Sequence, residues 1–184
     1  MISQIDGCES VGLVNLMEMK ISWNTVPRLV VILYLAYMLI AVVFLEKTWF
    51  FVDGANLMFH EAGHFILGLL GPISGTALQM VIPTVCVGYF LVRKEWFSGV
   101  ICVFWAGENL VNISVYIKDA IPQILPLVGG GEHDWTRMLS EWGVLEHYLV
   151  IGGFVFWVGV GIMLVSWLAL LYLMLLESKW KLLT

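Results

Sequence analysis

Two histidines and a glutamate in the stretch ANLMFHEAGHFILGLLG, residues 55–71, have the types and spacing of a metal site. On a helix, His60 and His64 lie about 40° apart on one face, one turn above the other. Imidazole nitrogen suits zinc, and two such ligands supply half of a tetrahedral shell. Glu61 points about 100° away from His60, as a general base rather than a ligand would. The pattern predicts a metal-dependent hydrolase, and Gly63 would leave the helix bare for a substrate backbone.

The composition around this motif is that of a membrane protein. Hydrophobic residues make up 60% of the 184 residues and charged residues only 12%, against about 25% charged in soluble domains. An ionisable side chain in a bilayer core costs roughly 2.5–3.5 kcal/mol on insertion scales, and three lie within five residues here. This clustering favours a metal site over satisfied packing residues or a proton relay.

The elements that would position the motif are apolar runs long enough to cross a bilayer. We expect an all-α, polytopic integral membrane helix bundle of about five spans. Residues 1–25 would form an extramembrane or interfacial segment, and residues 26–184 a single membrane-embedded domain. The expected spans cover residues 27–45, 56–70, 76–92, 96–117 and 149–176.

A catalytic zinc ion normally takes a third protein ligand and leaves its fourth position to water. The long connection at 118–148 contains GGGEHDW, which makes Asp134 and His133 nearly equal candidates, ahead of Glu108 in the fourth expected span. With five spans, this connection would lie on the side opposite to the one where the His60 helix enters. The apolar lead-in IPQILPLV would then form a re-entrant segment. The alternative is a surface turn with a helix N-cap at Asp134.

Polar amides also lie within the expected spans. Asn109 and Asn112 are three residues apart on one helical face, where they could bond neighbouring helices or position a substrate carbonyl. Gln79 allows the same two interpretations. The three cysteines include no CxxC pair, and no cluster of lysine and arginine exists to bind nucleic acid.

The motif FHEAGHF in an apolar segment, with a later Gly-rich segment that contains Asp134, resembles the site-2-protease clan of intramembrane zinc metalloproteases. The resemblance is specific over residues 56–71 and loose elsewhere. It implies that His60, His64 and Asp134 hold Zn²⁺ and that Glu61 activates water. In that clan glycine follows the aspartate, whereas here three glycines precede it. The chain also looks similar to small bacterial membrane proteins with a His-Asp-Trp segment, which implies a bacterial inner membrane.

The resemblance and the motif together lead us to expect a zinc metalloprotease that cleaves membrane proteins or peptides at the lipid bilayer, with no nucleic-acid partner. Two other functions fit the same residues. One is a non-catalytic, protease-like membrane subunit, and the other is a transporter or proton relay that uses buried histidine and glutamate.

Overall fold

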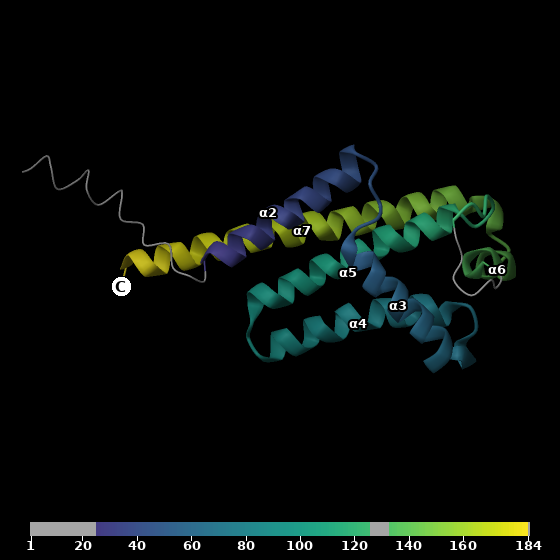
Figure 1. The fold of residues 1–184 in the computed structure, drawn as a ribbon, viewed down its shortest axis with the longest axis horizontal. Coiled ribbons are helices and arrows are strands. Elements are labelled where there is room, and N and C mark those ends of the chain that lie inside the picture. Colours follow the sequence, from purple (N-terminus) through teal and green to yellow (C-terminus); the bar gives the residue numbers. More distant parts are fainter. Residues whose placement is uncertain (1–24, 126–132, 184) are drawn as a thin grey trace, which may run out of the picture.

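Helices form every regular element in the part of the chain that the computed structural model describes, residues 25–125 and 133–183 (Figure 1). The expected all-α bundle is thereby confirmed, while the expected N-terminal segment lies outside the described residues up to residue 24. The α-helices are α2 (Thr25–Phe44), α3 (Phe51–Ile66), α4 (Ile73–Val92), α5 (Trp96–Lys118), α6 (Asp134–Glu141) and α7 (Tyr148–Leu183).

The core of the bundle is the antiparallel pair α5 and α7, which run side by side (Figure 1). Glycine lets their backbones approach closely: a Cβ atom on Gly159 would lie 2.6 Å from the Gly107 carbonyl oxygen. Small residues at such crossings are typical of membrane helices. Helix α2 packs on α7, where Trp167 Nε1 donates to the Ile32 carbonyl oxygen at 3.1 Å. Buried side chains of α2 and α7, including Leu35, Ala41, Met163 and Leu170, fill this interface.

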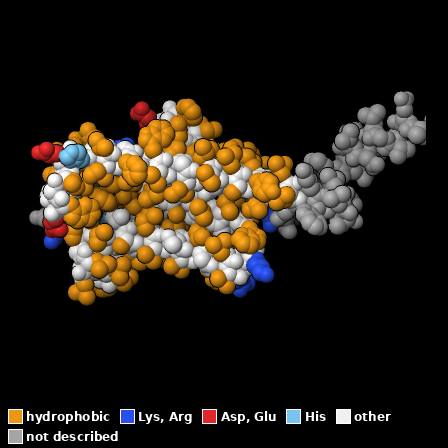
Figure 2. Space-filling view, turned by 180° about the vertical axis from the view of Figure 1, so that it is seen from behind, with side chains coloured by type: hydrophobic (Ala, Val, Ile, Leu, Met, Phe, Trp, Pro, Cys, Tyr) orange, Lys and Arg blue, Asp and Glu red, His pale blue; other side chains and the backbone are white. Residues whose placement is uncertain are grey.

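Four of the helices in the described ranges are long and apolar enough to cross a membrane: α2, α4, α5 and the stretch Leu145–Leu176 that includes most of α7. Hydrophobic side chains cover most of the face in Figure 2, and charged side chains lie at its edges. These features support the prediction of an integral membrane protein.

Four such helices, rather than the expected number of about five, are found among the described residues, because the helix that carries the HExxH motif is shorter. Helix α3 has 16 residues, about 24 Å at 1.5 Å per residue, whereas a span needs about 20 residues. It also buries polar side chains, Asp53 and Asn56, against the bundle.

This change of topology brings the motif and the 118–148 connection to the same end of the bundle. Helices α4 and α5 form a hairpin, so α4 begins where α5 ends, and α3 packs on α4. Helix α6 follows α5 at that end (Figure 1). No re-entry is therefore needed for residue 134 to reach the motif. The expected re-entrant segment itself falls partly in residues 126–132, outside the described residues.

Candidate metal centre

Helix α3 holds His60 and His64 with their rings directed to one point. Their Nε2 atoms lie 3.2 Å apart, as expected for two residues one turn apart on a helix. The start of α4 packs against this turn of α3. A Cβ atom on Gly63 would lie 2.4 Å from the Ser74 carbonyl oxygen, so Gly63 faces α4. The expectation that Gly63 admits a substrate backbone is wrong, because the backbone of α4 already occupies that space.

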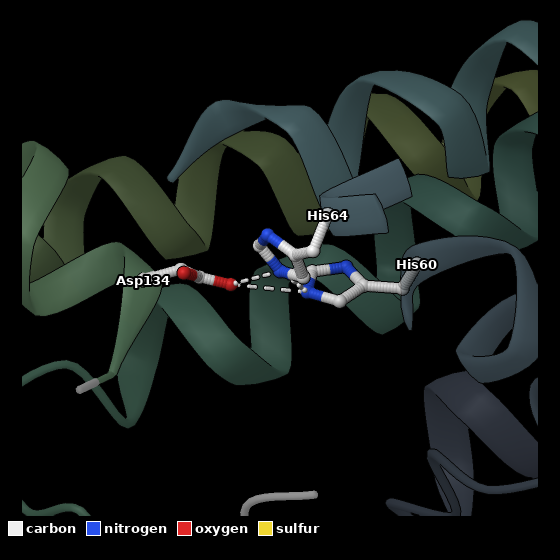
Figure 3. A group of neighbouring side chains, drawn as sticks. All are labelled: His60, His64 and Asp134. Carbon is white, nitrogen blue, oxygen red and sulfur yellow. Dashed lines mark hydrogen bonds and ion pairs between the residues drawn. The ribbon is translucent and has the colours of Figure 1, made fainter. Parts of the chain in front are cut away.

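Asp134 completes the group from the other side. It is the first residue of α6, and its Oδ2 atom lies 3.1 Å from His60 Nε2 and 2.9 Å from His64 Nε2. Figure 3 shows the carboxylate pointing at both imidazole rings. Among the described residues, His60, His64 and Asp134 form a group of possible metal ligands whose atoms all lie within 4.8 Å of one another.

The three donor atoms fit a zinc ion. Ligands about 2.0–2.1 Å from zinc at tetrahedral angles are about 3.3 Å apart, close to the separations of 2.9, 3.1 and 3.2 Å seen here. Glycine keeps the adjacent space open, since a Cβ atom on Gly75 would lie 2.6 Å from His60 Nε2 and 2.7 Å from His64 Nε2. The side chains of His60, His64 and Asp134 retain 20%, 33% and 24% exposure, so the group is not sealed.

The outer nitrogen of each imidazole also has a partner, as is usual for metal-binding histidine. His60 Nδ1 lies 3.3 Å from Gln79 Oε1, and His64 Nδ1 lies 3.0 Å from Ser74 Oγ. Both rings are thus held with Nε2 towards the shared point.

Asp134 is suited to bind a cation. Burial by itself raises the pKa of its carboxyl, but the hydrogen-bonding and electrostatic interactions with the neighbouring His60 and His64 side chains outweigh burial. The pKa therefore lies below its ordinary value. The carboxylate is ionised at neutral pH, which is the form that a metal ion requires.

The other two candidates for the third ligand lie elsewhere. His133 is the N-cap of α6: its Nδ1 accepts from Thr136 N at 3.4 Å, and its Nε2 lies 3.5 Å from Asp119 Oδ2. The expected alternative of an N-cap at Asp134 is thus off by one residue. Glu108 is buried in α5 and accepts from Asn56 Nδ2 at 2.9 Å. Of the three candidates, only Asp134 reaches the histidine pair.

A cavity of about 460 Å³ opens at this group, within the size range of small-ligand sites. Glu61 lines the cavity together with His60, His64 and Asp134. The sequence did not single out other lining side chains: Ser74, Tyr116, Trp135 and Arg137. Tyr116 follows Asn112 by four residues and so shares its helical face. That spacing is the one signal by which the sequence could have identified it.

The two asparagines of α5 differ in their placement. Asn112 lines the cavity, but it donates to Asp53 Oδ1 at 2.6 Å and accepts from Gln79 Nε2 at 3.0 Å. Asn109 is fully buried and donates to the Trp105 carbonyl oxygen at 3.2 Å. Both amides therefore bond the protein itself, and the role in substrate positioning stays a prediction.

Comparison of the chain with protein-family models, with curated proteins and with solved structures found no match. The function must therefore be inferred from the site itself.

Proposed function

We propose that this protein is an intramembrane zinc metalloprotease, as the resemblance to the site-2-protease clan implies, and that it acts in a bacterial inner membrane. The observation that carries the proposal is the convergence of Asp134 on His60 and His64 across 70 or more residues of sequence, beside the cavity that Glu61 lines. Two imidazoles and one carboxylate match the donor set of catalytic zinc sites with an open position.

The roles of the residues follow from their chemistry. His60, His64 and Asp134 would hold Zn²⁺, which lowers the pKa of a coordinated water and polarises a scissile carbonyl. The Glu61 carboxylate would accept a proton from the attacking water as the water oxygen bonds to the carbonyl carbon. As the C–N bond breaks, Glu61 would return that proton to the leaving nitrogen.

Partial exposure of the three candidate ligands favours a catalytic over a structural zinc site, because structural sites are closed. The location favours substrates near the membrane surface. Ser74 and Gly75, which contact the histidines, are the second and third residues of α4. At 1.5 Å per residue they lie within about 5 Å of the helix end. We therefore expect cleavage of a locally extended segment of a membrane protein or peptide close to the surface of the bilayer.

The test is hydrolysis of membrane-protein peptides by the zinc-loaded protein in lipid nanodiscs, with zinc content measured on the same samples. Glu61→Gln should retain zinc and lower the cleavage rate by about 10²- to 10⁴-fold. Glu95→Gln is the matched control, because Glu95 precedes α5 at the opposite end of the α4–α5 hairpin and pairs with the exposed Arg93. Unchanged cleavage by Glu61→Gln contradicts the protease proposal, and absence of zinc in the parent protein would favour the transporter alternative.

A further inference from the structure

A chain of buried polar side chains runs from α3 through α5 and α4 to the outer nitrogen of His60. Asp53, Asn112 and Gln79 are 0%, 6% and 3% exposed. Asn112 Nδ2 lies 2.6 Å from Asp53 Oδ1, and Gln79 Nε2 lies 3.0 Å from Asn112 Oδ1. Gln79 Oε1 lies 3.3 Å from His60 Nδ1. Each link crosses from one helix to another, so the chain joins three helices to one imidazole ring.

The direction of every hydrogen bond in this chain follows from its far end. Both oxygens of Asp53 receive N–H donors, since Oδ2 accepts from Phe50 N at 2.5 Å and Oδ1 accepts from Asn112. Because N–H groups occupy both oxygens of Asp53, the amide nitrogen of Asn112 faces Asp53 and its oxygen faces Gln79. Gln79 must then donate to Asn112 with its amide nitrogen and present its oxygen to His60. The oxygen has no proton to give, so His60 Nδ1 is the donor.

We propose that Asp53, Asn112 and Gln79 form a positioning relay that holds His60 in the tautomer with its proton on Nδ1 and its free lone pair on Nε2, directed at the metal. The proposal rests on the metal site of the proposed function. The three residues act through His60, and none of them is a ligand. Because neutral imidazole has one donor nitrogen and one acceptor nitrogen, the bond at Nδ1 decides which form Nε2 takes.

His64 reaches the same tautomer by a separate and shorter route. The Ser74 hydroxyl donates its only proton to the Gly71 carbonyl oxygen at 2.7 Å. It can therefore only accept from His64 Nδ1, at 3.0 Å. The two histidines are thus prepared for a metal by independent partners, so that a change in the relay should affect His60 and leave the tautomer of His64 unchanged.

Substitutions at Gln79 can distinguish a hydrogen-bonding role of this side chain in the relay from a role in packing alone. Gln79→Met keeps the length of the side chain and removes the acceptor for His60, whereas Gln79→Glu keeps an acceptor and removes the bond to Asn112. Outer partners of metal-binding histidine typically contribute 10- to 100-fold to metal affinity. We expect Gln79→Met to weaken Zn²⁺ binding by about 10- to 100-fold and Gln79→Glu to stay within about threefold of the parent. Thr84→Val, an exposed change on the same helix, is the control and should leave affinity unaltered.

Two readouts on the full-length protein in nanodiscs decide the outcome. The first is the Zn²⁺ dissociation constant, measured by competition with a chelator. The second is the ¹⁵N spectrum of the histidine rings in zinc-free protein, which distinguishes a proton on Nδ1 from one on Nε2. The chain has only four histidines to assign. We expect Nδ1–H on His60 in the parent and a mixture of tautomers in Gln79→Met, with His64 unchanged.

Each result bears on one proposal. If Gln79→Met and Gln79→Glu weaken zinc binding equally, or if neither does, the relay is wrong while the metal site stands. A parent protein that shows Nε2–H on His60 overturns the relay without any variant, even if Gln79→Met fails to fold. A parent protein that binds no zinc contradicts the proposed function, and the ¹⁵N spectrum still tests the tautomer that the relay imposes.

Discussion

The α3–α4 contact at the candidate metal centre and the α5–α7 contact in the core both depend on glycine, but for different reasons. At the core contact, Gly159 lies against the backbone of Gly107, and the absent side chain lets two helices touch. At the metal centre, Gly75 lies against the ring atoms of His60 and His64, and the absent side chain leaves room beside the two donor nitrogens. The first region is a packed scaffold, and the second is a partly open site mounted on it.

Because of this difference, we expect substitutions in the two regions to affect different properties of the protein. Backbone contacts in the scaffold cannot move without shifting whole helices, whereas imidazole rings at the site can rotate at little cost to the fold. Substitutions in the scaffold should therefore lower stability, and substitutions at the site should lower metal affinity.

The largest effect is expected at Asp134, the candidate ligand that joins α6 to the histidines. Zinc binding of about 10–16 kcal/mol shared among about four ligands gives about 3–4 kcal/mol for each ligand. Asp134→Ala should thus weaken zinc binding by about 10²- to 10³-fold, as measured by chelator competition. Glu146→Ala removes an exposed carboxylate from the same connection and should have no effect. Equal zinc affinity in Asp134→Ala and the parent would exclude Asp134 as a ligand.

Gly75→Ala tests the site without removing any ligand. The added Cβ atom would stand 2.6–2.7 Å from both Nε2 atoms, in space that the metal site needs. Overpacking of this kind costs about 1–3 kcal/mol, or roughly 5- to 150-fold in zinc affinity. The thermal unfolding of the zinc-free protein should change little, because the rings can move aside.

Gly88→Ala is the control for this substitution, since it lies on the same helix with open space around the added atom. If Gly75→Ala clearly lowers the unfolding temperature of the zinc-free protein and Gly88→Ala does not, the separation between site and scaffold is wrong.

The sequence was sufficient for the local half of the site and insufficient for the distant half. His60, Glu61 and His64 belong to one helical turn, so their spacing alone placed them together. Asp134 lies 70 residues from His64, and its neighbour His133 was a nearly equal candidate from the residues alone. Which of two adjacent side chains faces the histidine pair depends on how α6 is rotated and capped, and this depends on contacts with Asp119 and Ala120 that spacing does not encode.

The difference between the four long apolar helices of the described residues and the expected number of about five has a related cause. By hydropathy, the α3 region looks like one more apolar segment. In the structure, however, Asp53 and Asn56 of α3 form hydrogen bonds with Asn112 and Glu108 of α5. Polar side chains that satisfy one another across helices cost far less than isolated ones, so α3 can bury Asp53 and Asn56 against the bundle. Such pairing between helices is invisible to a window of consecutive residues, and the relay to His60 was missed for the same reason.

Gly159→Ala is the matching test of the scaffold. Its Cβ atom would lie 2.6 Å from the Gly107 carbonyl oxygen and 3.0 Å from Val111 N, and both are backbone atoms. We expect a loss of about 1–3 kcal/mol in the free energy of unfolding, with zinc affinity within about threefold of the parent. Gly161→Ala, on the same helix with no atom within 4 Å of its Cβ position, is the control. Loss of zinc affinity without loss of stability would show that the two regions are not separable.

The smallest effect is expected at His133, which links scaffold and site as the N-cap of α6. His133→Ala removes the acceptor for Thr136 N, and loss of an N-cap costs about 1 kcal/mol. Because α6 carries Asp134, zinc affinity should fall by no more than about fivefold. His133→Asn restores an N-cap acceptor and should recover most of that loss in the same chelator competition. If His133 were instead the third ligand, both substitutions would weaken binding as severely as Asp134→Ala does, because asparagine cannot replace an imidazole nitrogen at zinc.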